Sequence, residues 1–212
     1  MNGTEPLLRD ISVTLNPDTP EWPGDTPFSC GWASLIGAGA SVNVSSFTSS
    51  PHVGTHADAP LHVHDGWPAS DALPLEAFLG DALVLDVSDA PAGPLSIDVD
   101  DLRLAGVQRL LLRTGRCIAD GRFPSDWPVL DHSAATRLTE RGLRLFGVDA
   151  PSVDARHSTG LEVHHALFGG GAYVLENLDL RGVHTGHYEL IALPQRLAGL
   201  DAAPVRAVLR SR

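Results

Sequence analysis

Cysteine is scarce in this chain of 212 residues, where Cys30 and Cys117 are the only two. They lie far apart and outside any paired motif, so the sequence favours neither a disulfide framework nor a cysteine-ligated zinc site. Free cysteines usually behave as small apolar groups, and we therefore expect both thiols to be buried.

Long hydrophobic runs are missing as well. No stretch reaches the roughly 18 apolar residues of a membrane span, and no basic segment followed by an apolar one opens the chain. The formal charge of −11 would repel phosphate backbones and anionic lipids, which argues against nucleic-acid and membrane partners. The sequence also lacks a Gly-x-Ser-x-Gly elbow and a glycine-rich phosphate loop, so serine catalysis and nucleotide binding lose support. We expect a cytoplasmic protein.

The composition is 43% hydrophobic, which is enough for a sizeable core in one domain. Short runs rich in β-branched and aliphatic residues predict strands, and two segments have helical signals. The predicted strands cover residues 11–15, 42–47, 82–88, 109–114, 144–149, 172–178, 187–194 and 204–210. The predicted helices cover residues 133–142 and 159–169, the second with Thr159 and Glu162 as a capping box. We expect a single mixed α/β domain over residues 1–212.

Histidine is abundant and unevenly placed, because four of the ten histidines fall between positions 52 and 64. The even positions of this segment hold His52, His56, Asp58, His62 and His64. Side chains alternate along an extended chain, so these groups tend toward one side of it. The prolines and the glycine within the segment argue against a helix. We therefore place the cluster on an irregular strand or loop.

Imidazoles and a carboxylate that converge on one point suit a divalent transition metal such as zinc or manganese. Without a metal, such groups repel one another when protonated and need separate hydrogen-bond partners when buried. Glu176 ends an apolar run, where a charge is costly unless it is paired or ligated. His165 points about 100° away from its helical neighbour His164, so one ion does not take both as ligands. A solvated His-rich loop is the alternative interpretation.

The string His52-Val-Gly-Thr-His56-Ala-Asp58-Ala-Pro60-Leu-His62 resembles the HxGTHxDxPxH signature of the metal-dependent cyclase-like hydrolases. The likeness continues through residues 22–27, 149–152, 192–194 and 200–209. It implies a swivelling β/β/α domain, a mixed sheet with flanking helices. It also implies a binuclear centre of two divalent ions, usually zinc with manganese as an alternative, in which Asp58 bridges. The implied metal ligands are His52, His56, Asp58, His164 and Glu176. His62 would act as proton donor and acceptor, and Trp22 would pack against an aromatic substrate.

The resemblance is greatest to the formamidase branch of that family. It implies hydrolysis of a small aryl formamide, N-formyl-L-kynurenine, to L-kynurenine and formate in tryptophan degradation, by a homodimer or homotetramer. Divalent ions lower the pKa of bound water and polarise a carbonyl, so the protein needs no covalent nucleophile of its own.

Two other functions are open at this stage. One is a related hydrolase that acts on another aryl or cyclic amide or on a lactone, and the other is a metal-binding module without activity. His64 is equally compatible with orienting a metal ligand and with an exposed loop, while Trp22 is the substrate wall or a cover for the core.

Overall fold

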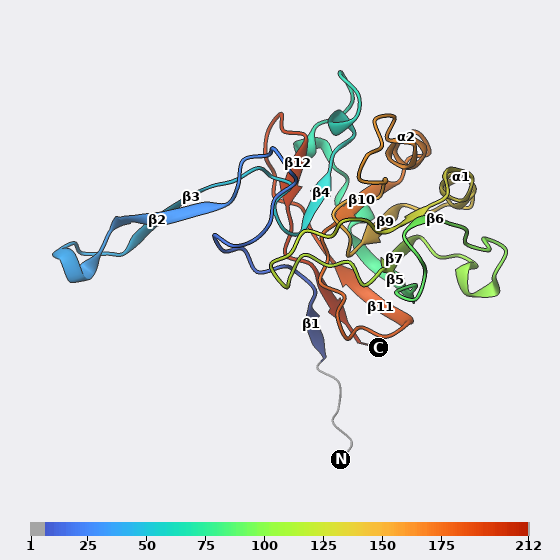
Figure 1. The fold of residues 1–212 in the computed structure, drawn as a ribbon, viewed down its shortest axis with the longest axis horizontal. Coiled ribbons are helices and arrows are strands. Elements are labelled where there is room, and N and C mark those ends of the chain that lie inside the picture. The colour runs from blue at the N-terminus through green and yellow to red at the C-terminus, as the bar shows by residue number, and fades with distance from the viewer. Residues whose placement is uncertain (1–6, 212) are drawn as a thin grey trace, which may run out of the picture.

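The computed structural model describes residues 7–211, and its main element is a mixed sheet. The strands of this sheet are β1 (Leu8–Asp10), β4 (His56–Asp58), β5 (Leu79–Asp86), β7 (Arg109–Arg113), β9 (Leu145–Val148), β10 (Tyr173–Glu176), β11 (Gly186–Ile191), β12 (Ala202–Pro204) and β13 (Val208–Arg210). Their order is β1-β13-β11-β5-β7-β9-β10-β4-β12 (Figure 1). The central strands β5, β7, β9 and β10 run parallel and are largely buried, which explains their continuous aliphatic sequences.

The sheet curls, because only a few residues of the chain link a strand at one edge of the sheet to a strand near the opposite edge. Strand β12 lies at one edge and β13 lies next to the other, yet only residues 205–207 separate them. Backbone hydrogen bonds hold this link, from Val205 N to Thr55 O at 3.0 Å and from Ile11 N to Ala207 O at 2.9 Å. The prediction of one strand over residues 204–210 is therefore wrong, because β12 ends at Pro204 and the chain crosses to the other end of the sheet before β13 begins at Val208.

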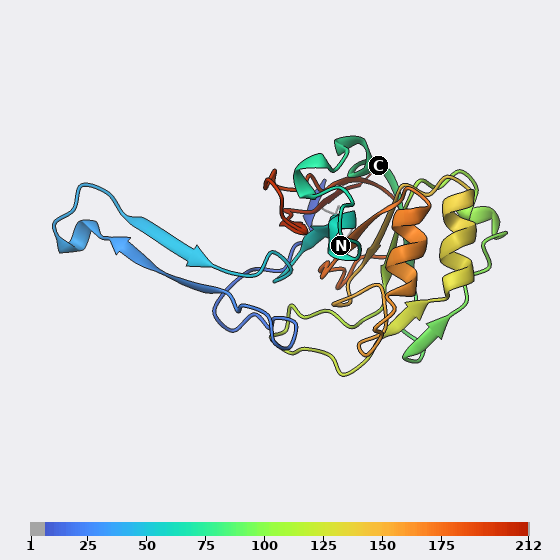
Figure 2. The ribbon, with the colours of Figure 1, turned by 90° about the horizontal axis from the view of Figure 1, so that it is seen from above.

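Two α-helices, α1 (His132–Glu140) and α2 (Glu162–Gly169), lie side by side against one face of the sheet (Figure 2). Asp131 caps α1 by accepting from Ser133 N. The predicted capping box of α2 is wrong. Leu161 is the N-cap residue, and its side chain makes no capping hydrogen bond. Asp154, from the preceding loop, instead accepts hydrogen bonds from the N–H groups of Val163 and His164.

The remaining elements are short. The 3-10 helices span Ile36–Ala38, Pro60–His62, Ser70–Ala72, Leu75–Ala77 and Leu102–Leu104. Strands β6 (Gly93–Leu95) and β8 (Pro128–Leu130) form a parallel pair of their own. Strands β2 (Ser29–Ser34) and β3 (Val44–Thr48) form an antiparallel hairpin that projects away from the body of the molecule (Figures 1 and 2). We call residues 28–48 the hairpin arm.

The mixed α/β class, with a mixed sheet and flanking helices, is confirmed. Residues 11–15 are not a strand: Ser12 makes an isolated bridge, and Val13 N donates to the Thr55 hydroxyl rather than to a ladder. The expected burial of both thiols is also wrong, because Cys30 is exposed on the arm and Cys117 is half-buried. Within residues 7–211, no helix is long and apolar enough to cross a bilayer.

Candidate metal centre

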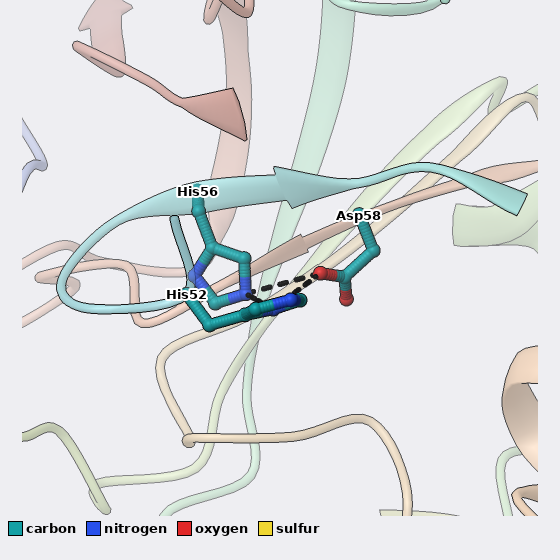
Figure 3. A group of neighbouring side chains, drawn as sticks. All are labelled: His52, His56 and Asp58. Atoms are coloured by element: carbon teal, nitrogen blue, oxygen red, sulfur yellow. Dashed lines mark hydrogen bonds and ion pairs between the residues drawn. The ribbon is translucent and has the colours of Figure 1, made fainter. Parts of the chain in front are cut away.

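Strand register places the first ligand candidates. His56 and Asp58 are two residues apart on β4, so their side chains share one face of the strand. On the neighbouring antiparallel strand β10, Glu176 lies directly opposite His56. His52 comes from the turn before β4, and its ring folds back toward His56 and Asp58 (Figure 3). Helix α2 supplies His164, which is buried.

Asp58 lies at the centre of the cluster, and its two oxygens face different partners. Oδ1 is 3.1 Å from Nδ1 of His52 and 3.1 Å from Nε2 of His56. Oδ2 is 3.3 Å from Nε2 of His164. Glu176 also reaches both sides, because its Oε2 is 3.5 Å from His56 Nε2 and its Oε1 is 3.4 Å from His164 Nε2. Two candidate ligand triads therefore share Asp58: His52–His56–Asp58 and Asp58–His164–Glu176.

Each of the three histidines in these triads turns one ring nitrogen toward the cluster and anchors the other. For His56, Nδ1 lies 2.9 Å from the carbonyl oxygen of Gly54. His164 Nδ1 lies 2.7 Å from Asp154, and His52 Nε2 lies 2.9 Å from Asp201. A carbonyl or carboxylate on the far nitrogen fixes the tautomer, so the inward nitrogen is left with its lone pair for a cation.

The cluster carries strong electrostatic coupling. Burial by itself lowers the pKa of His56, but the carboxylates of Asp58 and Glu176 outweigh it and raise that pKa to about 10. Burial also lowers the pKa of His52, while Asp201 and Asp58 raise it to about 9. Burial opposes ionisation of Asp58, yet the neighbouring imidazoles hold its pKa well below the usual range. The carboxylates therefore attract positive charge, which protons or metal cations can provide.

The residues fit a divalent metal. Oδ1 of Asp58 is fully buried, and within residues 7–211 it has no hydrogen bond of acceptable geometry. Leaving a buried carboxylate oxygen without such a bond is costly, whereas a cation at this point would satisfy it. The donor set of imidazole nitrogens and carboxylate oxygens is one that zinc and manganese accept.

A cavity of about 450 Å³ opens onto the cluster. Its polar wall includes His52, His62, His164 and Glu176, and its apolar wall includes Trp22. The ring of His62 lies 4.4 Å from that of His52 between centroids, so this histidine joins the group from the 3-10 helix after β4. The cavity volume is within the range of small-molecule sites.

Trp22 lies between the cavity and the core. It lines the cavity and is half-buried. Its ring meets Phe123 edge-on at 5.6 Å and Trp127 at 6.1 Å. The two interpretations of Trp22 are thus compatible in space, because one side of the ring packs on core aromatics while the residue still borders the cavity.

The other histidines lie outside the cluster. His64 is exposed, and its ring stacks on Trp67 at 4.7 Å between centroids. The alternation of side chains expected for this segment ends at the 3-10 helix Pro60–His62, so His64 does not share the side of His56 and Asp58. His165 is exposed on the outer side of α2, whereas His164 is buried beside Asp58. The four remaining histidines are exposed: His132, His157, His184 and His187.

Three further site residues were not predicted from the sequence. Asp154 and Asp201 hold the far nitrogens of His164 and His52. Asn177 lines the cavity with a left-handed backbone, at φ 54°, and its buried Oδ1 has no hydrogen bond among the described residues. Asp154 and Asp201 lie in stretches whose sequence is typical of ordinary loops. Only the tertiary structure shows that they contact His164 and His52. For Asn177, its place next to Glu176 was the one available signal.

Solved structures with this fold point to the same chemistry. One described as a potential metal-dependent hydrolase with cyclase activity has a TM-score of 0.80 and 25% identity, covering 97% of this chain and 98% of that chain. Isatin hydrolase A from Labrenzia aggregata, bound to benzyl benzoate, has a TM-score of 0.78 and 25% identity, covering 95% of this chain and 92% of that one. Fold and ligand cluster together define a metal-dependent hydrolase.

Sequence comparisons narrow the class further. Kynurenine formamidase from Bacillus mycoides is 45% identical over 202 residues, which is 95% of this chain and 96% of that protein. The Cyclase family model matches residues 9–155. The chain belongs to the Cyclase family, and it is a metal-dependent amidohydrolase.

Proposed function

We propose that this enzyme hydrolyses N-formyl-L-kynurenine to L-kynurenine and formate, with two divalent ions at the centre. The observation that supports two ions is the position of Asp58, whose two oxygens face separate ligand triads. Zinc is the first choice of metal and manganese the second, because histidine and carboxylate ligands accept both. The similarity to the Bacillus mycoides kynurenine formamidase supports the substrate.

In this proposal His52, His56 and Asp58 hold one ion, and Asp58 with His164 and Glu176 holds the other. When bound, such ions acidify a water molecule and polarise the carbonyl oxygen of the substrate. The reaction adds water to the formyl carbon and breaks the carbon–nitrogen bond, so one proton has to pass from the water to the leaving nitrogen.

His62 is the residue we assign to this proton transfer. Its Nδ1 lies 3.2 Å from Asp201, which leaves Nε2 as the nitrogen that takes and returns the proton. An imidazole nitrogen can accept a proton and later donate it, so one side chain can serve both directions of transfer. The side chain is 31% exposed at the edge of the cavity, where it can reach a bound substrate.

The aryl group of the substrate needs an apolar wall. Trp22 and Phe123 border the cavity next to the metal ligands, and their edge-on packing keeps the two rings in fixed positions. An aromatic contact of this kind contributes about 0.5–1.5 kcal/mol beyond the burial of area. The proposal includes a cytoplasmic location, which suits two cysteines that are both free thiols.

A second substrate class has its own support. The isatin hydrolase among the structural neighbours acts on isatin, and its structure aligns with 95% of this chain. A cyclic amide is opened by the same addition of water to a carbonyl, so the ligand cluster alone does not distinguish the two substrates.

The test is turnover of N-formyl-L-kynurenine by metal-loaded protein, compared with formanilide, isatin and an aryl lactone. We expect the highest kcat/KM for N-formyl-L-kynurenine. His62→Ala should lower kcat by about 100-fold or more while metal still binds. His64→Ala is the matched control, because His64 is exposed outside the cluster and its loss should leave turnover unchanged. Preference for isatin, or equal effects of the two variants, would refute the assignment.

A further inference from the structure

A tight turn brings an aromatic ring and a carboxylate to the same wall of the cavity. Asp25 N donates to Trp22 O at 2.9 Å, and Pro23 and Gly24 occupy the two positions between them. A proline followed by a glycine with a positive φ, here 103° at Gly24, is typical of a type II turn. Trp22 and Asp25 both line the cavity, so the turn sets an acidic side chain beside an aromatic one.

Asp25 brings an uncompensated charge to this wall. Its half-buried carboxylate accepts a hydrogen bond from Ser50 Oγ at 3.2 Å, and within residues 7–211 it forms no ion pair. Each of the other two carboxylates on the wall, Asp201 and Glu176, lies within 3.5 Å of two imidazole nitrogens. Asp25 therefore has a negative charge for which the described residues provide no partner of opposite sign.

The chemistry of the wall favours a cationic group at Asp25. Among the described residues that line the cavity none is an arginine, and the chain contains no lysine. A primary ammonium has three N–H donors and a positive charge, and its hydrogen bonds to a carboxylate are stronger than those between neutral groups. A carboxylate or phosphate at the same point would be repelled. The wall thus distinguishes ligands by the charge that they carry near the aromatic ring.

Ser50 connects Asp25 to the candidate metal centre. Its hydroxyl oxygen, which donates to Asp25, also accepts a hydrogen bond from His52 N at 3.3 Å. Asp25 therefore lies one hydroxyl group away from the backbone of a proposed metal ligand. A substrate whose carbonyl carbon reacts at the cluster, and whose ring packs on Trp22, has Asp25 within reach of a short substituent on that ring.

We propose that Asp25 is a specificity-determining residue, whose carboxylate binds a primary ammonium on a ring substituent of the aryl formamide. This assignment rests on the proposed function, because N-formyl-L-kynurenine carries an α-ammonium on the substituent next to its formamide. Formanilide and isatin have no ammonium. Asp25 therefore supplies the distinction between substrates that the ligand cluster alone does not make.

Asp25→Asn is the variant that tests the charge. The amide has the same shape as the carboxylate and can still accept from Ser50 Oγ, so the turn should keep its structure. Loss of a charged hydrogen-bond partner should raise KM for N-formyl-L-kynurenine by about 10-fold or more. The ammonium is remote from the reacting carbonyl and binds equally in the ground state and the transition state, so kcat should change by less than about 2-fold.

Two analogues of the substrate isolate the ammonium. N-Formylkynuramine keeps the ammonium and lacks the carboxylate, and its KM should rise by the same factor in Asp25→Asn. The desamino analogue of N-formyl-L-kynurenine keeps the carboxylate and lacks the ammonium. Its KM should fall in the variant, because the charge of Asp25 repels the carboxylate of this analogue in the wild type.

Glu21→Gln is the matched control. Glu21 lies in the same loop and has the same charge, but it does not line the cavity. A general weakening of the negative field would affect both variants equally, whereas a direct contact affects Asp25→Asn alone. An equal rise of KM in the two variants, or an equal rise for the desamino analogue, would overturn the proposal.

Inhibition by kynuramine tests Asp25 separately from the proposed function. Kynuramine has the aromatic ring and the ammonium but no formyl group, so it binds without reacting. Its inhibition constant against formanilide hydrolysis by the metal-loaded protein should rise about 10-fold in Asp25→Asn, while that of aniline stays the same. If the wild type does not hydrolyse N-formyl-L-kynurenine but shows this difference, the proposed function fails and the role of Asp25 stands. Turnover of N-formyl-L-kynurenine with equal kynuramine inhibition of wild type and variant would leave the proposed function intact and refute the role of Asp25.

Discussion

The carboxylate of Asp154 lies 2.7 Å from Nδ1 of His164, and it also accepts hydrogen bonds from the N–H groups of Val163 and His164. One side chain therefore caps helix α2 and orients His164, a proposed metal ligand on that helix. The start of the helix and the inward direction of His164 Nε2 are set by the same carboxylate, which couples local folding to the geometry of the centre.

Asp154→Asn should weaken metal binding because an amide holds the imidazole less firmly than a carboxylate does. Loss of a partner that orients a ligand typically costs 10- to 100-fold in metal affinity. Competition with a fluorescent chelator measures this. Asp131→Asn is a matched control, since Asp131 caps α1 in the same manner without touching a ligand, and its metal affinity should equal that of the wild type. Equal losses for both variants would assign the effect to helix capping alone.

Asp201 accepts contacts from both His52 Nε2 and His62 Nδ1, at 2.9 and 3.2 Å. In protein saturated with metal, we expect Asp201→Asn to lower kcat with little change in KM, because His62 loses the charged partner that fixes its tautomer. In a His62→Ala background the same change should cost much less, since residues that act together are not additive. Steady-state kinetics of the two single variants and the double variant provide the check. Fully additive losses would mean that Asp201 does not act through His62.

Trp22 offers a test of substrate binding. Trp22→Ala should raise KM for an aryl formamide by about 2- to 10-fold, which corresponds to an aromatic contact of roughly 0.5–1.5 kcal/mol. KM for N-methylformamide, which has no ring, should stay the same. If Trp22 only covers the core, the variant would lower the melting temperature and leave the ratio of the two KM values unchanged.

Gly147 marks a close approach in the centre of the sheet. A methyl group there would lie 2.5 Å from Cδ2 of Leu111 and 3.1 Å from Cδ1 of Leu178. Gly147→Ala should therefore destabilise the fold by about 1–3 kcal/mol through overpacking. Gly169→Ala is the control, because its methyl group meets nothing within 4 Å at the end of α2. Urea unfolding of both variants measures the difference, and equal stabilities would show that the core relaxes around the extra atom.

The sequence contained the strongest local signals of the site but not its long-range partners. The alternation of His56 and Asp58 holds because β4 is extended there. The isolated charge of Glu176 in an apolar run also pointed to a ligand, and β10 places it opposite His56. Asp154 and Asp201 were not predictable, since the loops that carry them reach the site only when the sheet curls and α2 packs against it. Similarly, the strand pattern at residues 42–47 predicted β3 without indicating that the hairpin leaves the body.

We propose that the buried cluster around Asp58 holds the metal on which the hydrolysis depends. The most direct measurement is zinc titration of chelator-treated protein, with bound zinc per chain and N-formyl-L-kynurenine hydrolysis followed together. We predict that the stripped protein stays folded and inactive, and that activity returns as two equivalents bind, but not in Asp58→Asn. Full activity in the stripped protein, or full recovery in Asp58→Asn, would contradict the account.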